Sequence, residues 1–105
     1  MNMENRKHLP IGSVVRLKNL DRDLMIVGLF PVVEKEGEQR YFDYTATYLP
    51  IGSVHQDNAF FNKEDIEEVI FIGYIEINFQ QLLANYEEMV EKINYPKFQV
   101  SDFNR

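Results

Sequence analysis

The chain of 105 residues carries a net charge of −6, with 45% hydrophobic residues, 13% aromatic residues and no cysteine. This length fits one domain with its own core, and the absence of cysteine excludes disulfides and Cys-based zinc or nucleophile chemistry. An acidic chain with no cluster of Lys and Arg repels phosphate backbones, so nucleic acid is excluded as an expected partner.

Residues 1–8 are polar and lack the apolar segment of a secretory signal, so we expect a flexible N-terminus on a cytoplasmic protein. The longest apolar stretch, Leu24–Val33, is interrupted by Gly28 and Pro31 and is too short to span a bilayer. The sequence therefore predicts no membrane insertion.

A hexapeptide, Leu-Pro-Ile-Gly-Ser-Val, occurs twice, at Leu9–Val14 and at Leu49–Val54. Proline and glycine beside apolar runs mark the ends of β-strands. The residues after the two copies differ completely, and two repeats are too few for a repeat architecture. We therefore interpret the copies as two similar turns in one small domain.

Three strands are predicted in the first half of the chain. Ser13–Asn19 alternates apolar and polar residues, as a half-buried strand does. Leu24–Phe30 is apolar at nearly every position, which predicts a central strand buried on both faces. The charged segment Glu34–Arg40 is interpreted as a loop with its tight point at Gly37, and Tyr41–Tyr48 as the third strand.

A short helix is predicted to begin after Asn62, which is a good N-cap residue. Glu64 and Asp65 lie in its first turn, where the helix dipole favours negative charge. The pattern then switches to a strand over Val69–Ile72, and Gly73 ends that strand.

The last third of the chain predicts a long amphipathic helix over residues 76–95, capped at Asn78 and ended by Pro96. Burial of the seven apolar side chains on its stripe stabilises by about 10–20 kcal/mol gross. The stripe must therefore lie on the sheet, on a second copy of the chain or on another protein. Together with two Phe residues of the tail, 96–105, it forms the candidate protein-binding set. Its members are Phe79, Leu82, Leu83, Tyr86, Met89, Val90, Ile93, Phe98 and Phe103.

These elements predict an α+β fold. We expect a mostly antiparallel sheet of four or five strands, with a short inserted helix and the long C-terminal helix packed on one face. An SH3-like barrel with an appended helix is the alternative. The expected organisation is a flexible N-terminus over 1–8, a β-rich domain over 9–75, the amphipathic helix over 76–95 and the tail over 96–105.

Residues that could carry catalysis are few. His55 lies near Ser53 and Asp57, but neighbours in one loop do not make a triad, which is defined by spatial geometry. Asp21 and Asp23 flank an arginine that would oppose a bound cation, and a cation site needs several convergent oxygens. We therefore expect no enzyme, and no metal or cofactor site.

An aromatic set in and after the third strand can serve a ligand groove, a peptide-binding face or the core, and core packing is the more frequent use. Its members are Tyr41, Phe42, Tyr44, Tyr48, Phe60 and Phe61.

An ordered set of short motifs resembles a small domain-of-unknown-function family of Gram-positive bacteria, encoded among type VII secretion genes near toxins with an LXG-type N-terminal domain. The resemblance extends from Leu9 to about Tyr74. It implies a toxin-binding accessory protein, and it transfers no catalytic residue. In that family the second turn often carries an acidic residue where Ile51 stands here. The motifs are Leu9–Val15 with Leu17, Leu24–Gly28, Asp43-Tyr44, Tyr48 with Pro50 and Gly52, Phe61-Asn62 with Asp65-Ile66, and Gly73-Tyr74.

The expected function is thus a non-enzymatic protein-interaction module, acting as an adaptor or chaperone for an LXG-type toxin. Its binding surface would be the C-terminal helix with the tail, or an exposed sheet edge. A small-molecule or peptide-binding barrel-like domain and a toxin immunity protein are the alternatives, and a homodimer through the apolar stripe is also compatible with the sequence.

Overall fold

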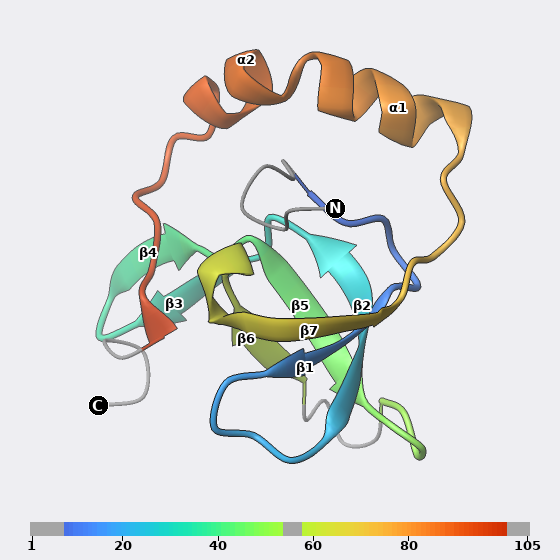
Figure 1. Cartoon of the computed structure of the whole chain (residues 1–105). Coiled ribbons are helices and arrows are strands. Elements are labelled where there is room, and N and C mark those ends of the chain that lie inside the picture. The colour runs from blue at the N-terminus through green and yellow to red at the C-terminus, as the bar shows by residue number, and fades with distance from the viewer. Residues whose placement is uncertain (1–7, 54–57, 101–105) are drawn as a thin grey trace.

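The computed structural model describes residues 8–53 and 58–100 (Figure 1). Its main element is a five-stranded antiparallel sheet in the order β6-β5-β2-β1-β7, and β3 and β4 form a second, two-stranded sheet. The elements are β1 Val14–Leu17, β2 Asp23–Leu29, β3 Val32–Lys35, β4 Glu38–Tyr41, β5 Tyr44–Tyr48, β6 Ala59–Phe61, the 3-10 turn η2 Lys63–Asp65, β7 Ile66–Phe71, α1 Ile77–Ala84 and α2 Tyr86–Glu91.

The predicted α+β fold is confirmed, and the SH3-like barrel is not. In the described residues β6 and β7 lie at opposite ends of the sheet, so the sheet stays open. β2 is central, as predicted, but its side chains alternate: Leu24 and Ile26 are fully buried and Val27 is exposed. One face of the sheet therefore carries the core. The core residues are Leu9, Val15, Leu24, Ile26, Tyr44, Ala46, Phe61 and Ile66.

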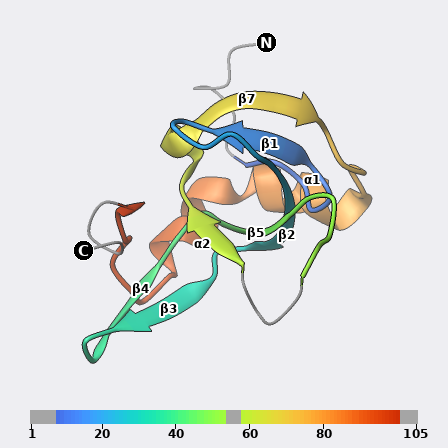
Figure 2. The same ribbon diagram turned by 90° about the horizontal axis from the view of Figure 1, so that it is seen from below.

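The charged segment that was predicted to be a loop is a β-hairpin. β3 pairs with β4 up to Lys35 and Glu38, and the two residues between them, Glu36 and Gly37, have φ of 55° and 80°. Two successive positive φ values are typical of the tight turn that matches strand twist. The hairpin projects away from the main sheet (Figure 2), so most of its side chains are exposed or half-buried. The sequence of the hairpin is therefore rich in charged residues and lacks the alternation of apolar and polar residues by which a half-buried strand is recognised.

The predicted third strand, Tyr41–Tyr48, is divided in two. Tyr41 ends β4, Tyr44 begins β5, and Phe42 and Asp43 lie between them as the chain passes from one sheet to the other. Both intervening side chains are buried, which is why the sequence pattern runs on without a break.

The predicted short helix is a single 3-10 turn, and β7 begins at Ile66, earlier than expected. β7 pairs with β1 through two register shifts, so that Ile66 and Val69 both lie against the core while Glu67 and Glu68 are exposed. A bulge of this kind places two consecutive residues on the outer side. The resulting spacing of three is the same as in a helix, and it accounts for the wrong prediction.

The predicted long C-terminal helix is wrong: α1 and α2 are two short helices that arch over the rim of the sheet (Figure 1). The break is at Asn85, whose φ and ψ of −110° and 23° are not helical. Its side-chain amide donates to the Gln81 carbonyl, so the side chain competes with the backbone for that acceptor. The N-cap is Glu76 and not Asn78, because the Glu76 carboxylate accepts from the Phe79 amide at 2.8 Å.

A buried polar network fixes the chain after α2 to the sheet. The fully buried Asn62 accepts from the Asp43 amide at 3.0 Å and donates to the Phe98 carbonyl at 2.7 Å. The Lys97 ammonium lies 3.0 Å from the buried Asp43 carboxylate. The Phe98 amide donates to the Tyr41 carbonyl at 2.7 Å, so the start of the tail extends the β3–β4 sheet by one bridge.

His8, which we expected to belong to the flexible N-terminus, is part of the fold. His8 is only 3% exposed; its Nε2 lies 2.9 Å from the Asp43 carbonyl, and its ring stacks on Phe30 at 4.4 Å. Residues 1–7 lie outside the described residues. Within the described residues, no helix has the length and apolar character needed to cross a membrane.

Candidate protein-interaction surface

The apolar stripe predicted to bind a partner does not form one continuous exposed face: some of its residues pack into the fold and the others are half-buried. Phe79 is nearly buried and lines a groove together with Leu82. Tyr86 turns inward, with its ring 5.5 Å from that of His8 and its hydroxyl 2.9 Å from the Lys63 ammonium. The remaining helical members are half-buried: Leu83, Met89, Val90 and Ile93.

Phe98, the tail residue of that set that the structure describes, does not lie in an exposed arm. Phe98 is 5% exposed and stacks on Phe42 with ring centroids 5.4 Å apart, and the Arg40 guanidinium lies 5.1 Å from the centroid of the Phe98 ring. Phe98 therefore anchors the chain to the fold. Phe103 lies outside the described residues.

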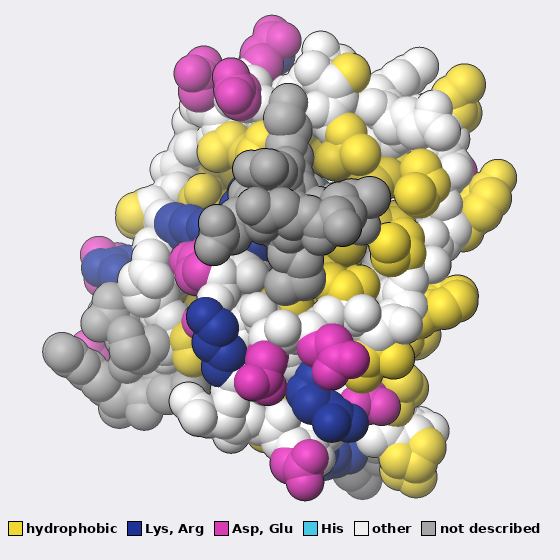
Figure 3. Space-filling model, viewed as in Figure 1, with side chains coloured by type: hydrophobic (Ala, Val, Ile, Leu, Met, Phe, Trp, Pro, Cys, Tyr) yellow, Lys and Arg dark blue, Asp and Glu magenta, His cyan; other side chains and the backbone are white. Residues whose placement is uncertain are grey.

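The exposed apolar side chains gather instead where β7 ends and α1 begins, on the right of Figure 3. β7 is an edge strand of the sheet, and the segment after it continues the apolar run up to the first residue of α1. Exposed apolar patches of this kind mark interaction sites on soluble proteins. We call this patch the β7 surface; it consists of Ile11, Ile70, Phe71, Ile72, Tyr74, Ile75 and Ile77.

A close approach of two backbone segments builds one side of the β7 surface. A Cβ atom at Gly73 would lie 2.5 Å from the Ile11 carbonyl oxygen and 2.8 Å from backbone atoms of Gly12 and Ser13. The Gly73 amide also donates to the Ser13 hydroxyl at 3.0 Å. Only glycine allows this contact, which holds Ile11 beside the start of the 74–77 segment.

An apolar groove of about 370 Å³ lies between the first Leu-Pro-Ile-Gly turn, at residues 9–12, and α1. A second, more polar hollow shares Asn78 and Leu82 with the groove and extends it toward α2; its other lining residues are Gln81, Asn85, Glu88, Met89 and Lys92. Among the described residues, Glu76 is the one acidic residue that lines the groove itself. The residues around the groove are Pro10, Ile11, Leu29, Tyr74, Glu76, Asn78, Phe79 and Leu82.

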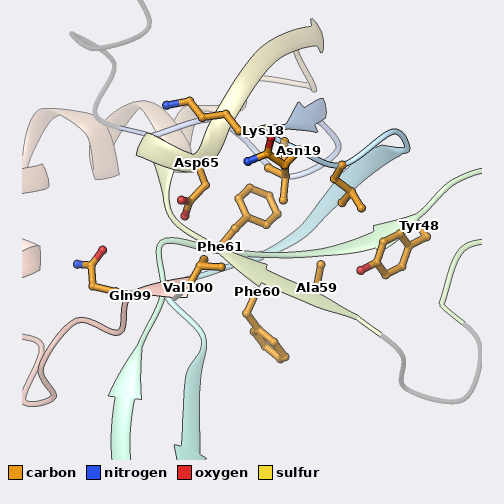
Figure 4. A pocket seen from close by; sticks show the side chains of 11 residues that line it. Lys18, Asn19, Tyr48, Ala59, Phe60, Phe61, Asp65, Gln99 and Val100 are labelled. Atoms are coloured by element: carbon orange, nitrogen blue, oxygen red, sulfur yellow. The ribbon is translucent and has the colours of Figure 1, made fainter. Parts of the chain in front are cut away.

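A separate pocket of about 580 Å³ lies near the other edge of the sheet (Figure 4). The predicted aromatic set is divided here. Tyr41, Phe42 and Tyr44 are buried in the fold, whereas three members line the pocket. The lining residues are Leu17, Lys18, Asn19, Leu20, Tyr48, Ala59, Phe60, Phe61, Asp65, Gln99 and Val100.

Three groups near these sites have shifted pKa values. Burial raises the pKa of the Asp65 carboxyl, even though the Asn62 amide donates to it at 2.9 Å. Burial also raises the pKa of the Tyr41 phenol. For Lys97 burial acts to lower the pKa, but the adjacent Asp43 carboxylate outweighs it and the pKa is raised.

The candidate catalytic and metal-binding residues do not converge in the described part of the chain. Asp23 forms an ion pair with Arg16 at 2.7 Å, and the Ser53 hydroxyl donates to Asn58. His55 and Asp57 lie outside the described residues. In residues 8–53 and 58–100, His, Asp and Glu form no group of three or more that could hold a metal ion.

Sequence reasoning missed the β7 surface, although the sequence contained a signal. The run Val69–Ile77 is apolar at seven of nine positions and is longer than the strand it contains. The apolar residues of this run that follow the end of the strand have no place in the sheet, and they make up most of the β7 surface.

Comparison with known protein families identifies a match over most of the chain. A protein-family model described as "Domain of unknown function (DUF4176)" matches residues 8–82, which include β1 to β7 and most of α1. No curated protein and no solved structure matches the chain.

Proposed function

The chain belongs to the DUF4176 family, a family of unknown function, and we propose that it works as a non-enzymatic protein-interaction module in the cytoplasm. The observation that carries this proposal is the β7 surface. Tyr74 is 81% exposed, Ile77 67% and Phe71 60%, and they lie in one continuous segment at a sheet edge. Large apolar side chains that a fold leaves in water are typical of a surface that a partner covers.

The finer proposal is that the partner is an LXG-type toxin, and that the chain is an adaptor or chaperone that binds the toxin before type VII secretion. This follows from the family resemblance of the motifs. Two of those motifs, Gly12-Ser13 and Gly73-Tyr74, are the segments whose close approach builds the β7 surface. Motif positions that shape an exposed surface support a role for that surface in the family's function.

The test is capture of an LXG-type protein encoded beside this chain, after co-expression of the two proteins. We expect the tagged chain to retain the toxin, and Tyr74→Ser or Ile77→Ser to reduce retention about tenfold or more, because central apolar contacts dominate interface energetics. Ile51→Ser is the matched control, since Ile51 is 74% exposed but lies in another turn.

Two outcomes would contradict the proposal. If the wild-type chain retains no toxin and leaves toxin solubility unchanged, the adaptor role is wrong. If the chain protects toxin-expressing cells and Tyr74→Ser has no effect on capture, the chain is an immunity protein that acts through another surface.

A second candidate function rests on the pocket of about 580 Å³, which has the size of a small-molecule site. Tyr48 and Phe60 offer ring faces there, and Lys18 and Asp65 offer charges. A fragment screen by NMR would test this function. Shifts of Tyr48 and Phe60 signals that saturate below about 1 mM ligand would support a binding pocket, and their absence across the screen would reject it.

A further inference from the structure

We propose that the partner segment is a basic amphipathic helix, which lies in the groove between the first turn and α1 with its Lys and Arg residues over the surrounding carboxylates. The inference rests on the proposed function, because it takes the groove that borders the β7 surface at Ile11 and Tyr74 as the binding site and identifies the kind of segment that fits it.

The charge distribution is the first argument. The span 64–91, which contains β7, the β7 surface after it, α1 and α2, carries eight acidic residues and no Lys or Arg. The rest of the chain has nine acidic and eleven basic residues and is therefore slightly positive. Four of these acidic residues lie at the helices beside the groove: Glu76 caps α1, and Glu87, Glu88 and Glu91 lie on α2. A basic partner would be attracted and oriented by this field, whereas an acidic one would be repelled.

The shape of the site is the second argument. The groove is lined mainly by apolar side chains, and the hollow that shares Leu82 with it carries the surface on toward Met89. The site is thus apolar beside the start of α1, where Glu76 lines it, and more polar toward α2, where Leu82 and Met89 lie among polar side chains and Glu88 pairs with Lys92 at 3.5 Å. A helix whose apolar residues recur every three or four positions places a row of side chains into such a groove.

An extended strand fits the same region less well. β7 is an edge strand, but two shifts in its pairing with β1 disturb its regularity, and Glu67 and Glu68 are both exposed along it. Bulges and charged residues are the devices by which natural proteins block strand addition at an edge. The apolar groove beside α1 is therefore favoured over the backbone edge of β7.

A second copy of the chain is also a poor occupant. The amphipathic helices of this chain belong to the same acidic span, with Glu87, Glu88 and Glu91 on α2. Docking them in the groove of another copy would bring carboxylates against carboxylates, which costs free energy unless each is paired.

The test uses three fluorescein-labelled peptides of about 18 residues and equal apolar content, measured by fluorescence anisotropy against the full chain. The first is a helical Lys/Leu peptide with Leu at helical spacing, the second is the same peptide with Glu for Lys, and the third is a Lys/Val peptide of alternating pattern. We expect the first to bind about tenfold tighter than the other two, and its affinity to fall as NaCl rises from about 50 to about 500 mM.

Matched variants locate the binding. Tyr74→Ser and Leu82→Ser, which both change residues of the groove, should weaken binding of the helical Lys/Leu peptide about tenfold, and Ile51→Ser less than about twofold. Glu87→Lys combined with Glu88→Lys on α2 should weaken it about fivefold, whereas Glu34→Lys on the distant hairpin should change it less than about twofold.

Several outcomes would overturn the inference. Tighter binding of the alternating peptide would identify strand addition, and equal losses in the Ile51 control would show that the groove is not the site. A dimer in sedimentation experiments that Tyr74→Ser dissociates would identify a second copy as the occupant. If the toxin is captured but none of the peptides binds, the proposed function stands and this inference fails. If the helical Lys/Leu peptide binds as expected but no toxin is captured, the groove binds basic helices as inferred and the proposed toxin-binding function fails.

Discussion

Asn62 is the residue on which the attachment of the C-terminal segment depends, and Asn62→Ala tests that attachment. The side chain is fully buried and makes two hydrogen bonds, one from the Asp43 amide and one to the Phe98 carbonyl. Alanine would leave both backbone groups buried without a partner. Each unsatisfied group costs about 1–3 kcal/mol, so the free energy of unfolding should fall by about 2–6 kcal/mol. This is a large share of the stability of a small domain, about 5–15 kcal/mol.

Urea unfolding measures the loss, and two further variants define its cause. Asn62→Asp keeps an oxygen acceptor for the Asp43 amide but removes the donor to Phe98 and adds a carboxylate beside Asp43, so it should destabilise at least as much as alanine. Asn78→Ala removes only an exposed side-chain hydrogen bond to Glu76 and should change the free energy of unfolding by less than about 0.5 kcal/mol.

Hydrogen exchange at the Phe98 amide, which donates to the Tyr41 carbonyl, separates local from global effects. We expect Asn62→Ala to accelerate exchange there more than in β2. A loss below about 1 kcal/mol with unchanged protection at Phe98 would refute the reasoning, because it would mean that the buried groups find other partners.

Two further predictions concern the fold. Gly73→Ala should lower the free energy of unfolding by about 1–3 kcal/mol or more, because its Cβ would meet three backbone atoms within 2.8 Å. Urea unfolding measures this loss, with Ile51→Ser as a neutral control. If Gly73→Ala leaves the free energy of unfolding unchanged, the turn at residues 11–13 moves aside freely and the reasoning is wrong. The raised pKa of Tyr41 means that the folded chain keeps the phenol proton above the ordinary value of 10.0, where the unfolded chain releases it. Stability that is present below about pH 10 should therefore fall as the pH rises further, and Tyr41→Phe should remove part of this fall in urea titrations at pH 9, 10 and 11; parallel curves for the two proteins would contradict the pKa shift.

The sequence predicted the elements whose side chains report burial directly. β1 and β2 follow from alternation and from a nearly continuous apolar run, and the α+β class follows from strands succeeded by an amphipathic segment. The second half of β7 was predicted as the strand Val69–Ile72, but its start was predicted to be helical, because a bulge at Glu67 and Glu68 gives that part the spacing of a helix. The β3–β4 hairpin escaped because it projects into solvent, where no apolar face is needed.

The helical part shows a different limit of sequence reasoning. The stripe from Phe79 to Ile93 has helical periodicity throughout, but local hydrogen bonding at Asn85 breaks the helix. The candidate surface was missed for a related reason. Periodicity drew attention to residues that the fold covers in part, whereas the residues left in water belong to an aperiodic run that includes Phe71 and Tyr74. Exposure is a property of tertiary packing, and the sequence pattern does not contain it.

The helical segment is fastened to the sheet at both of its ends, before α1 at Gly73 and after α2 at Lys97 and Phe98. A segment held at both ends cannot move away from the sheet, so most of its conformational entropy is already lost when the protein folds. A ligand that settles beside it then meets a preorganised wall and need not order one, which lowers the entropic penalty of association. Removal of the interactions at either end, at Gly73 or at Lys97 and Phe98, should therefore weaken binding even though no residue in contact with the ligand has been changed.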